Sequence, residues 1–104
     1  MIVDRGPPLP AGAISYRRIG PFDADAIPTG LLRRHDLKPG VWGVLTIAAG
    51  RIRFCWDDDA GGSHLLAPGD AMLIPPTVPH HLERDGRVSF SIAFHAEPLT
   101  NSAA

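Results

Sequence analysis

The chain has 104 residues, a formal net charge of −1 and a single cysteine, Cys55. A chain of this length forms one domain with one core and leaves no room for a nucleotide-binding βαβ unit beside it. The ten lysines and arginines are spread along the sequence instead of forming a basic stripe, so we expect no nucleic-acid partner. One cysteine also excludes an intrachain disulfide and any metal site built from several cysteines.

The first residues predict neither a secretion signal nor a membrane anchor. Three prolines interrupt residues 1–12, which lack the apolar run of a signal peptide. No segment approaches the roughly 20 apolar residues that a membrane-spanning helix needs. We therefore expect a cytoplasmic protein without a membrane partner, in which residues 1–12 form a proline-rich arm.

Glycines and prolines punctuate the chain at a spacing that is typical of short strands joined by turns. No run with a 3.6-residue apolar period predicts a helix. In chain order, strands are predicted at residues 13–19, 30–36, 41–48, 51–56, 64–67, 71–74, 80–84 and 87–94. This pattern predicts an all-β domain over residues 13–95, a sandwich or jelly-roll barrel, followed by a loose tail at residues 96–104.

Local turn signals set the expected strand ends. Gly20–Pro21 should end the first strand, and residues 22–28 should form a loop. Ala49–Gly50 is expected to turn one strand into the next. Asp85–Gly86 is a strong hairpin signal, which predicts that residues 80–84 pair with residues 87–94.

Alternation along the strands predicts which side chains face the core. Ile52, Phe54 and Trp56 share one face, while Cys55 shares the opposite face with Arg51 and Arg53. Because no electropositive helix end is predicted near Cys55, we expect a half-buried thiol and not a nucleophile.

Residues 69–80 resemble the second conserved motif of the cupin superfamily: glycine, five residues, proline, one residue, glycine, two residues, histidine. Gly69, Pro75 and His80 stand at the required spacing, with Thr77 where the second glycine is usual. If Leu82 belongs to the core, alternation turns His80 inward and the neighbouring His81 outward.

Residues 32–35, 38–43 and 74–80 narrow the resemblance further. Together they look like the small cupins related to the amino-terminal domain of the tellurite-resistance protein TehB and to the YeaR proteins. The resemblance covers residues 13–95 and implies a single cupin-type double-stranded β-helix, which is a jelly-roll barrel.

The first cupin motif normally supplies two histidines and a glutamate to a metal ion. Here only His35 stands in a comparable place. Leu37 occupies the position of the second histidine, and Gly43 lies near the position of the glutamate. The usual cage of three histidines and one carboxylate therefore cannot be carried over to this chain.

His35 and His80 are nevertheless the predicted metal ligands, with His64 as the third. Neutral imidazole is the commonest protein ligand for zinc, the expected ion, and also suits iron or nickel. Two imidazoles alone hold a divalent ion weakly, so Asp36, His95 or water could also complete the shell. The opposing interpretation is that His35 and His80 are hydrogen-bonded barrel histidines without a metal.

Three functions stay open at this point. The resemblance implies a metal-binding cupin of the tellurite-resistance or stress-response type, binding a divalent metal and a small anion. The alternatives are a metal-dependent enzyme, such as a dioxygenase or an isomerase, and a metal-free module for a small molecule. No catalytic residue is predicted, and pairing through an edge strand predicts a homodimer.

Overall fold

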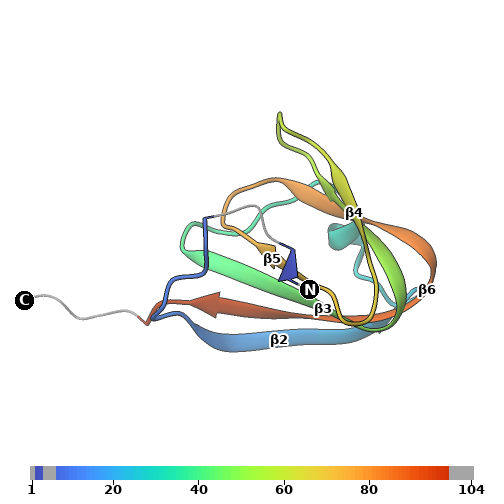
Figure 1. Cartoon of the computed structure of the whole chain (residues 1–104), viewed down its shortest axis with the longest axis horizontal. Helices are drawn as coiled ribbons and strands as arrows, with labels where there is room; N and C mark the ends of the chain where they lie inside the picture. The colour runs from blue at the N-terminus through green and yellow to red at the C-terminus, as the bar shows by residue number, and fades with distance from the viewer. Residues whose placement is uncertain (1, 4–6, 99–104) are drawn as a thin grey trace, which may run out of the picture.

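Strands make up most of the chain, and one 3-10 helix follows the second strand (Figure 1). The computed structural model describes residues 2–3 and 7–98. In chain order the elements are β1 (Ile2–Val3), β2 (Ile14–Asp23), η1 (Thr29–Leu32), β3 (Val41–Trp56), β4 (Ser63–Leu66), β5 (Ala71–Ile74) and β6 (His80–Ala96). None of the described residues forms a helix that is long and apolar enough to cross a membrane.

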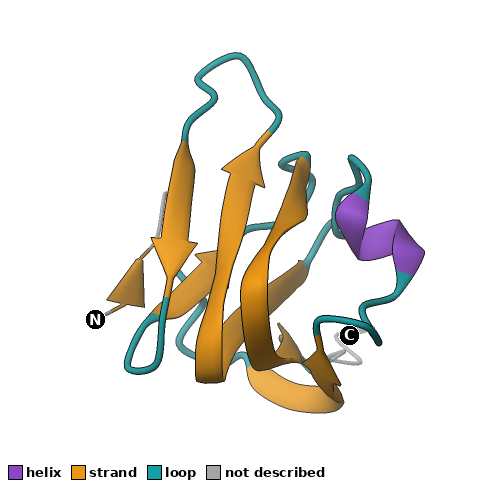
Figure 2. Cartoon of the chain, turned by 90° about the vertical axis from the view of Figure 1, so that its right-hand side faces the viewer, coloured by secondary structure: helices purple, strands orange, loops and turns teal. Residues whose placement is uncertain are grey.

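The strands form one sheet in the order β1-β5-β3-β6-β2, and β4 pairs with β3 off this path. All pairs are antiparallel except β1 with β5. The prediction of an all-β domain is confirmed, and Figure 2 shows how strongly the strands twist and curve. Within the described residues no pairing joins β1 to β2, so the closed jelly-roll barrel stays a prediction.

The centre of the fold is the long antiparallel pair of β3, with 16 residues, and β6, with 17 residues. The expected hairpin at Asp85–Gly86 is wrong, because the segments on both sides of it pair with β3 and not with each other. The expected turn at Ala49–Gly50 is likewise a bend inside β3, flanked by two register shifts. Both sequences that predicted a turn therefore lie at irregularities within the long ladder of β3 and β6.

Gly50 is the residue that allows this bend. Its φ is +70°, a conformation that a residue with a side chain adopts only with strain. A Cβ at this position would clash with the backbone carbonyl of Arg87. The backbones of β3 and β6 approach each other so closely here that only glycine fits.

Two other strand predictions also need correction. The strand β2 does not end at Gly20–Pro21 but continues to Asp23, with a register shift between Ile19 and Phe22. Residues 30–36 do not form a regular strand: the helix η1 is followed by an isolated β-bridge between His35 and His80. This bridge brings the two predicted metal ligands together.

The core lies on one face of the long strands, as the alternation of apolar residues predicts. Phe54, Phe90 and Leu45 are completely buried. The other buried hydrophobic residues are Ile27, Ile47, Ile52, Trp56, Leu66, Met72, Ile74, Leu82, Val88 and Ile92. They come from β3, β4, β5, β6 and the loop before η1, so the core fixes the relative positions of the strands that carry the candidate sites.

Candidate functional site

His35 and His80 are joined by two backbone hydrogen bonds, although 44 residues separate them in the sequence. The amide of His35 donates to the carbonyl of His80 at 3.0 Å, and the amide of His80 donates to the carbonyl of His35 at 2.8 Å. Residues paired in this way project their side chains to the same face of the ladder. The two imidazole rings meet edge to face with their centroids 4.2 Å apart.

Both rings make the same local hydrogen bond. Nδ1 of His35 lies 2.8 Å from the carbonyl of Arg33, and Nδ1 of His80 lies 2.8 Å from the carbonyl of Val78. A carbonyl oxygen only accepts, so Nδ1 must carry the proton in each ring. In the neutral form of each ring, Nε2 then holds the lone pair that a metal ion could bind.

His80 sits in an aromatic environment and is only 2% exposed. Its ring stacks on Phe54 at 5.1 Å, and Trp56 lies edge-on at 6.2 Å. Burial, together with the neighbouring His35, lowers the pKa of His80 to about 4, although the hydrogen bond to Val78 opposes the shift. His80 is therefore neutral at physiological pH, as a metal ligand must be.

Leu37 and Gly43, the two departures from the first cupin motif, are complementary in size. A Cβ on the buried Gly43 would lie 3.3 Å from Cδ1 of Leu37 and 3.4 Å from Cδ1 of Ile74. The leucine in place of a histidine therefore fills the space that a larger residue at position 43 would need. These two positions contribute packing and offer no metal ligand, so His35 and His80 are the motif positions that carry possible donor atoms.

The loop around Thr77, where the second cupin motif usually has a glycine, has an unusual backbone conformation. Thr77 has a φ of +64°, a left-handed conformation that explains why a glycine is usual at this place. Its amide donates to the carbonyl of Leu37 at 2.9 Å, and its hydroxyl donates to the carbonyl of Pro76 at 2.7 Å. The first of these bonds ties the second motif directly to the remnant of the first.

The other predicted ligands lie elsewhere. His64 is exposed on β4, opposite Phe54 in the register, and no hydrogen bond or ring contact among the described residues links it to His35 or His80. Asp36 is exposed beside His35. His95 is half-buried near the end of β6, opposite Trp42. A third protein ligand for the histidine pair thus stays a prediction.

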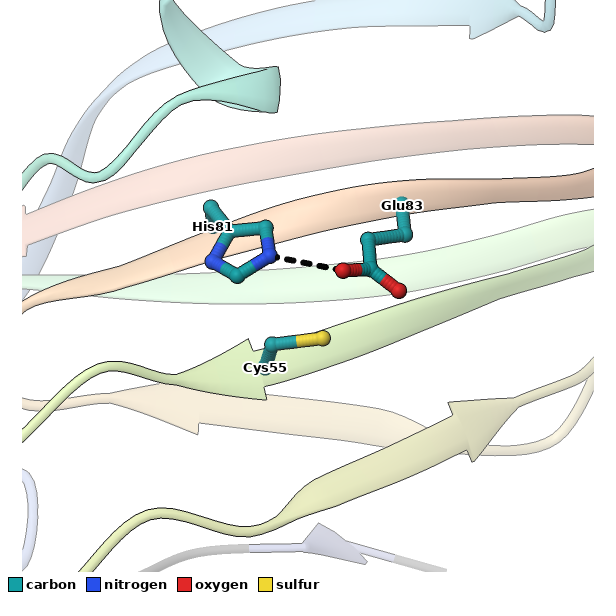
Figure 3. A group of neighbouring side chains, drawn as sticks. All are labelled: Cys55, His81 and Glu83. Atoms are coloured by element: carbon teal, nitrogen blue, oxygen red, sulfur yellow. Dashed lines mark hydrogen bonds and ion pairs between the residues drawn. The ribbon is translucent and has the colours of Figure 1, made fainter.

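A second group of potential ligands lies on the outer face of the same two strands: Cys55, His81 and Glu83 (Figure 3). One ligand atom from each residue lies within 4.8 Å of the other two, so the group could hold a metal ion. The sequence analysis placed His81 outward and Cys55 on the face away from the core, but did not connect them. The missing information was the register, in which Cys55 is directly opposite His81.

The three residues of this outer group all have shifted pKa values, because they interact with one another and with Asp57. Nε2 of His81 lies 2.9 Å from a Glu83 oxygen, and Nδ1 lies 2.7 Å from an Asp57 oxygen. These two hydrogen bonds raise the pKa of His81. Burial, together with the negative charges of Glu83 and Asp57, raises the pKa of the Cys55 thiol. The hydrogen bond from His81 lowers the pKa of Glu83.

Comparisons with known proteins bear on the fold. The described fold is similar to the crystal structure of TehB from Haemophilus influenzae, with a TM-score of 0.77 and 22% identity over 84% of this chain. The chain spans 32% of that TehB chain. It is also similar to the crystal structure of a protein from E. coli strain K12, with a TM-score of 0.79 and 23% identity over 90% of this chain and 100% of that one. A comparison with curated proteins gave no match.

The sequence itself carries the family assignment. Residues 17–92 match the TehB-like domain, and this match runs from β2 to near the end of β6. It includes His35, His80 and all of the outer group. The resemblance to the TehB-related proteins is thus confirmed: the chain belongs to the TehB-like domain family.

Proposed function

We propose that this chain is a small metal-binding domain of the cupin type, in which His35 and His80 bind a divalent ion. Zinc is the ion that we expect. The observation that supports the proposal is the β-bridge between His35 and His80, whose two rings are in edge-to-face contact. Backbone carbonyl groups accept the Nδ1 hydrogen of both rings, so Nε2 of each ring is the atom that can bind a metal ion. Zinc accepts such neutral nitrogen donors readily.

The donor set fits a partly open metal site better than a closed one. The chain offers two nitrogen donors at the motif positions, and Leu37 and Gly43 replace the others with apolar packing. Water or a small anion would fill the remaining positions, which would allow the ion to bind an oxyanion. We infer a role in the stress response that is related to tellurite resistance, in line with the family.

A cavity that begins at Asp36, the residue after His35 in the sequence, supports an anionic ligand. An open cavity of about 250 Å³ is lined by Arg17, Lys38 and Asp36, together with Tyr16, Leu37, Val41 and Phe94. Two cations at its wall would attract an anion that approaches the ion. A larger cavity of about 610 Å³ lies around Gly50 and Arg87, away from the histidine pair, and plays no part in this proposal.

The test is the metal content of untagged protein, purified without chelator and carrying Cys55→Ala so that the outer group cannot contribute. We expect close to one equivalent of zinc, and a loss of at least tenfold in zinc affinity in His80→Gln and in His35→Gln. His64→Gln tests the predicted third ligand, and an unchanged zinc affinity in this variant would exclude His64 alone from the site. Zinc content below about a tenth of an equivalent, or affinity unchanged by both substitutions, would refute the proposal and favour a metal-free module.

We also propose that the domain pairs as a homodimer through the free edge of β2. Among the described residues, β2 pairs with β6 alone, and its side chains are mostly exposed. Ile14 and Tyr16 are each 56% exposed on this edge, where a second copy would cover them. Light scattering should give the mass of a dimer, and Tyr16→Lys should shift the population towards the monomer. A monomeric mass for the unmodified chain would contradict this.

A further inference from the structure

We infer that the outer face of β3 and β6 carries a second metal site, in which Cys55, His81 and Glu83 bind a zinc-like divalent ion and Asp57 orients the histidine. The ladder explains how the residues meet. Cys55 faces His81 across the strand pair, and Glu83 follows His81 two residues later on the same face. The amide of Asp57 donates to the carbonyl of Pro79, so the ladder continues one step beyond β3 and places Asp57 beside His81.

The three donors match the chemistry of zinc. Thiolate sulfur, imidazole nitrogen and carboxylate oxygen are its ordinary ligands, and three protein donors leave a fourth position for water or an anion. The donor atoms already lie within 4.8 Å of one another, so only small side-chain rotations would bring them onto one ion. Glu83 is 54% exposed and Cys55 half-buried, which leaves a path for the ion from solvent.

His81 is oriented as metal-binding histidines usually are. One ring nitrogen donates to Asp57, and the other points at Glu83. Such a carboxylate partner on the far nitrogen fixes the ring and makes it a better donor. On binding, the ion would replace the proton on Nε2 of His81 and the thiol proton of Cys55, and both protons would pass to solvent. Glu83 would turn from hydrogen-bond acceptor to ligand.

The charge of the group also favours a cation. Two carboxylates, those of Glu83 and Asp57, lie near the thiol, and burial together with their negative charge raises its pKa. A divalent ion inverts this effect, because it stabilises the thiolate and is attracted by the same carboxylates. Arg53 is the nearby cation, and it directs Nη1 to the hydroxyl of Ser63 on β4 at 3.5 Å. No positive side chain is hydrogen-bonded to the thiol or to His81 within the described part of the chain.

The site is separate from the inner histidine pair, because His80 and His81 project to opposite faces of β6.

Cobalt(II) is the probe, since a thiolate bound to cobalt gives a charge-transfer absorption in the near ultraviolet that histidine and carboxylate do not give. The whole chain, freed of metal, should develop this band with Co²⁺. Cys55→Ser should lose it, and His81→Gln should weaken Co²⁺ binding by at least tenfold. Asp57→Asn should keep the band but lower the affinity about 10- to 100-fold, as expected of a positioning residue.

Zinc stoichiometry distinguishes this inference from the proposed function. The unmodified chain should bind about two equivalents, and Cys55→Ala and His80→Gln about one each. If His80→Gln removes no zinc while Cys55→Ala does, the inner site fails and the outer site stands. If cobalt gives no thiolate band, or Cys55→Ala binds zinc as the unmodified chain does, the outer site is overturned. Circular dichroism of each variant checks that the substitutions leave the fold intact.

Discussion

The buried His80 makes a quantitative prediction about stability in acid. Its pKa is about 4 in the folded chain, against 6.5 for the free side chain. Because the folded value is depressed, protons bind preferentially to the unfolded chain, so stability is complete above pH 6.5 and is lost as the pH falls towards 4. At 1.36 kcal/mol per pKa unit, the loss is about 2 kcal/mol by pH 5 and about 3 kcal/mol by pH 4. That is a large fraction of the stability of a small domain.

The assay is urea unfolding of metal-free protein at a series of pH values, followed by the fluorescence of the tryptophans. Other groups also titrate in this range, so the quantity to measure is the difference between the unmodified chain and His80→Gln, which cannot gain a proton. The unmodified chain should lose about 3 kcal/mol more than the variant between pH 7.5 and pH 4. His64→Gln, at an exposed position, should follow the unmodified chain. Parallel curves for the unmodified chain and His80→Gln would refute the reasoning.

Three further predictions concern the backbone and the outer face. Gly50→Ala should destabilise the fold by more than about 2 kcal/mol, because the cost of a left-handed φ adds to a clash with the β6 backbone. Gly86→Ala is the control, since it meets only the φ penalty of about 1–2 kcal/mol. Equal losses of stability for the two variants in urea unfolding would contradict the close approach of the strands at Gly50. Thr77→Gly should stabilise by up to about 1 kcal/mol despite losing a hydroxyl hydrogen bond, and a lower urea midpoint would argue against strain at this residue. The raised pKa of His81 predicts the opposite sign to His80: its stabilisation is present below pH 6.5 and fades as the pH rises through the folded value, so His81→Gln should cost more at pH 6 than at pH 9.

Alternation predicted the local part of the fold well. Ile52, Phe54 and Trp56 are buried as expected, and His80 points inward while His81 does not. The strand at residues 71–74 also has the expected bounds. These predictions succeeded for one reason: the two-residue period of a strand can be recognised from neighbouring residues, so no knowledge of distant partners is needed.

The long-range part could not be predicted in the same way. Asp85–Gly86 has the composition of a hairpin turn, but pairing with β3 on both sides of it wins over the local signal. The pairing of Cys55 with His81 follows from the same register, which no local pattern specifies. Only the motif spacing pointed to His35 and His80 as partners, and it could not show that the link between them is a backbone bridge.

The bulges around Gly50 have a consequence for both candidate sites. Because side chains alternate along a strand, a slip of β6 by one residue against β3 would exchange His80 and His81 between the two faces. The imidazole now packed on Phe54 would face water, and the one now held by Asp57 would enter the core. The irregular stretch at Gly50 matches only one alignment of the two strands, so it fixes the register between them. A glycine far from either group of ligands thereby decides which histidine serves which face.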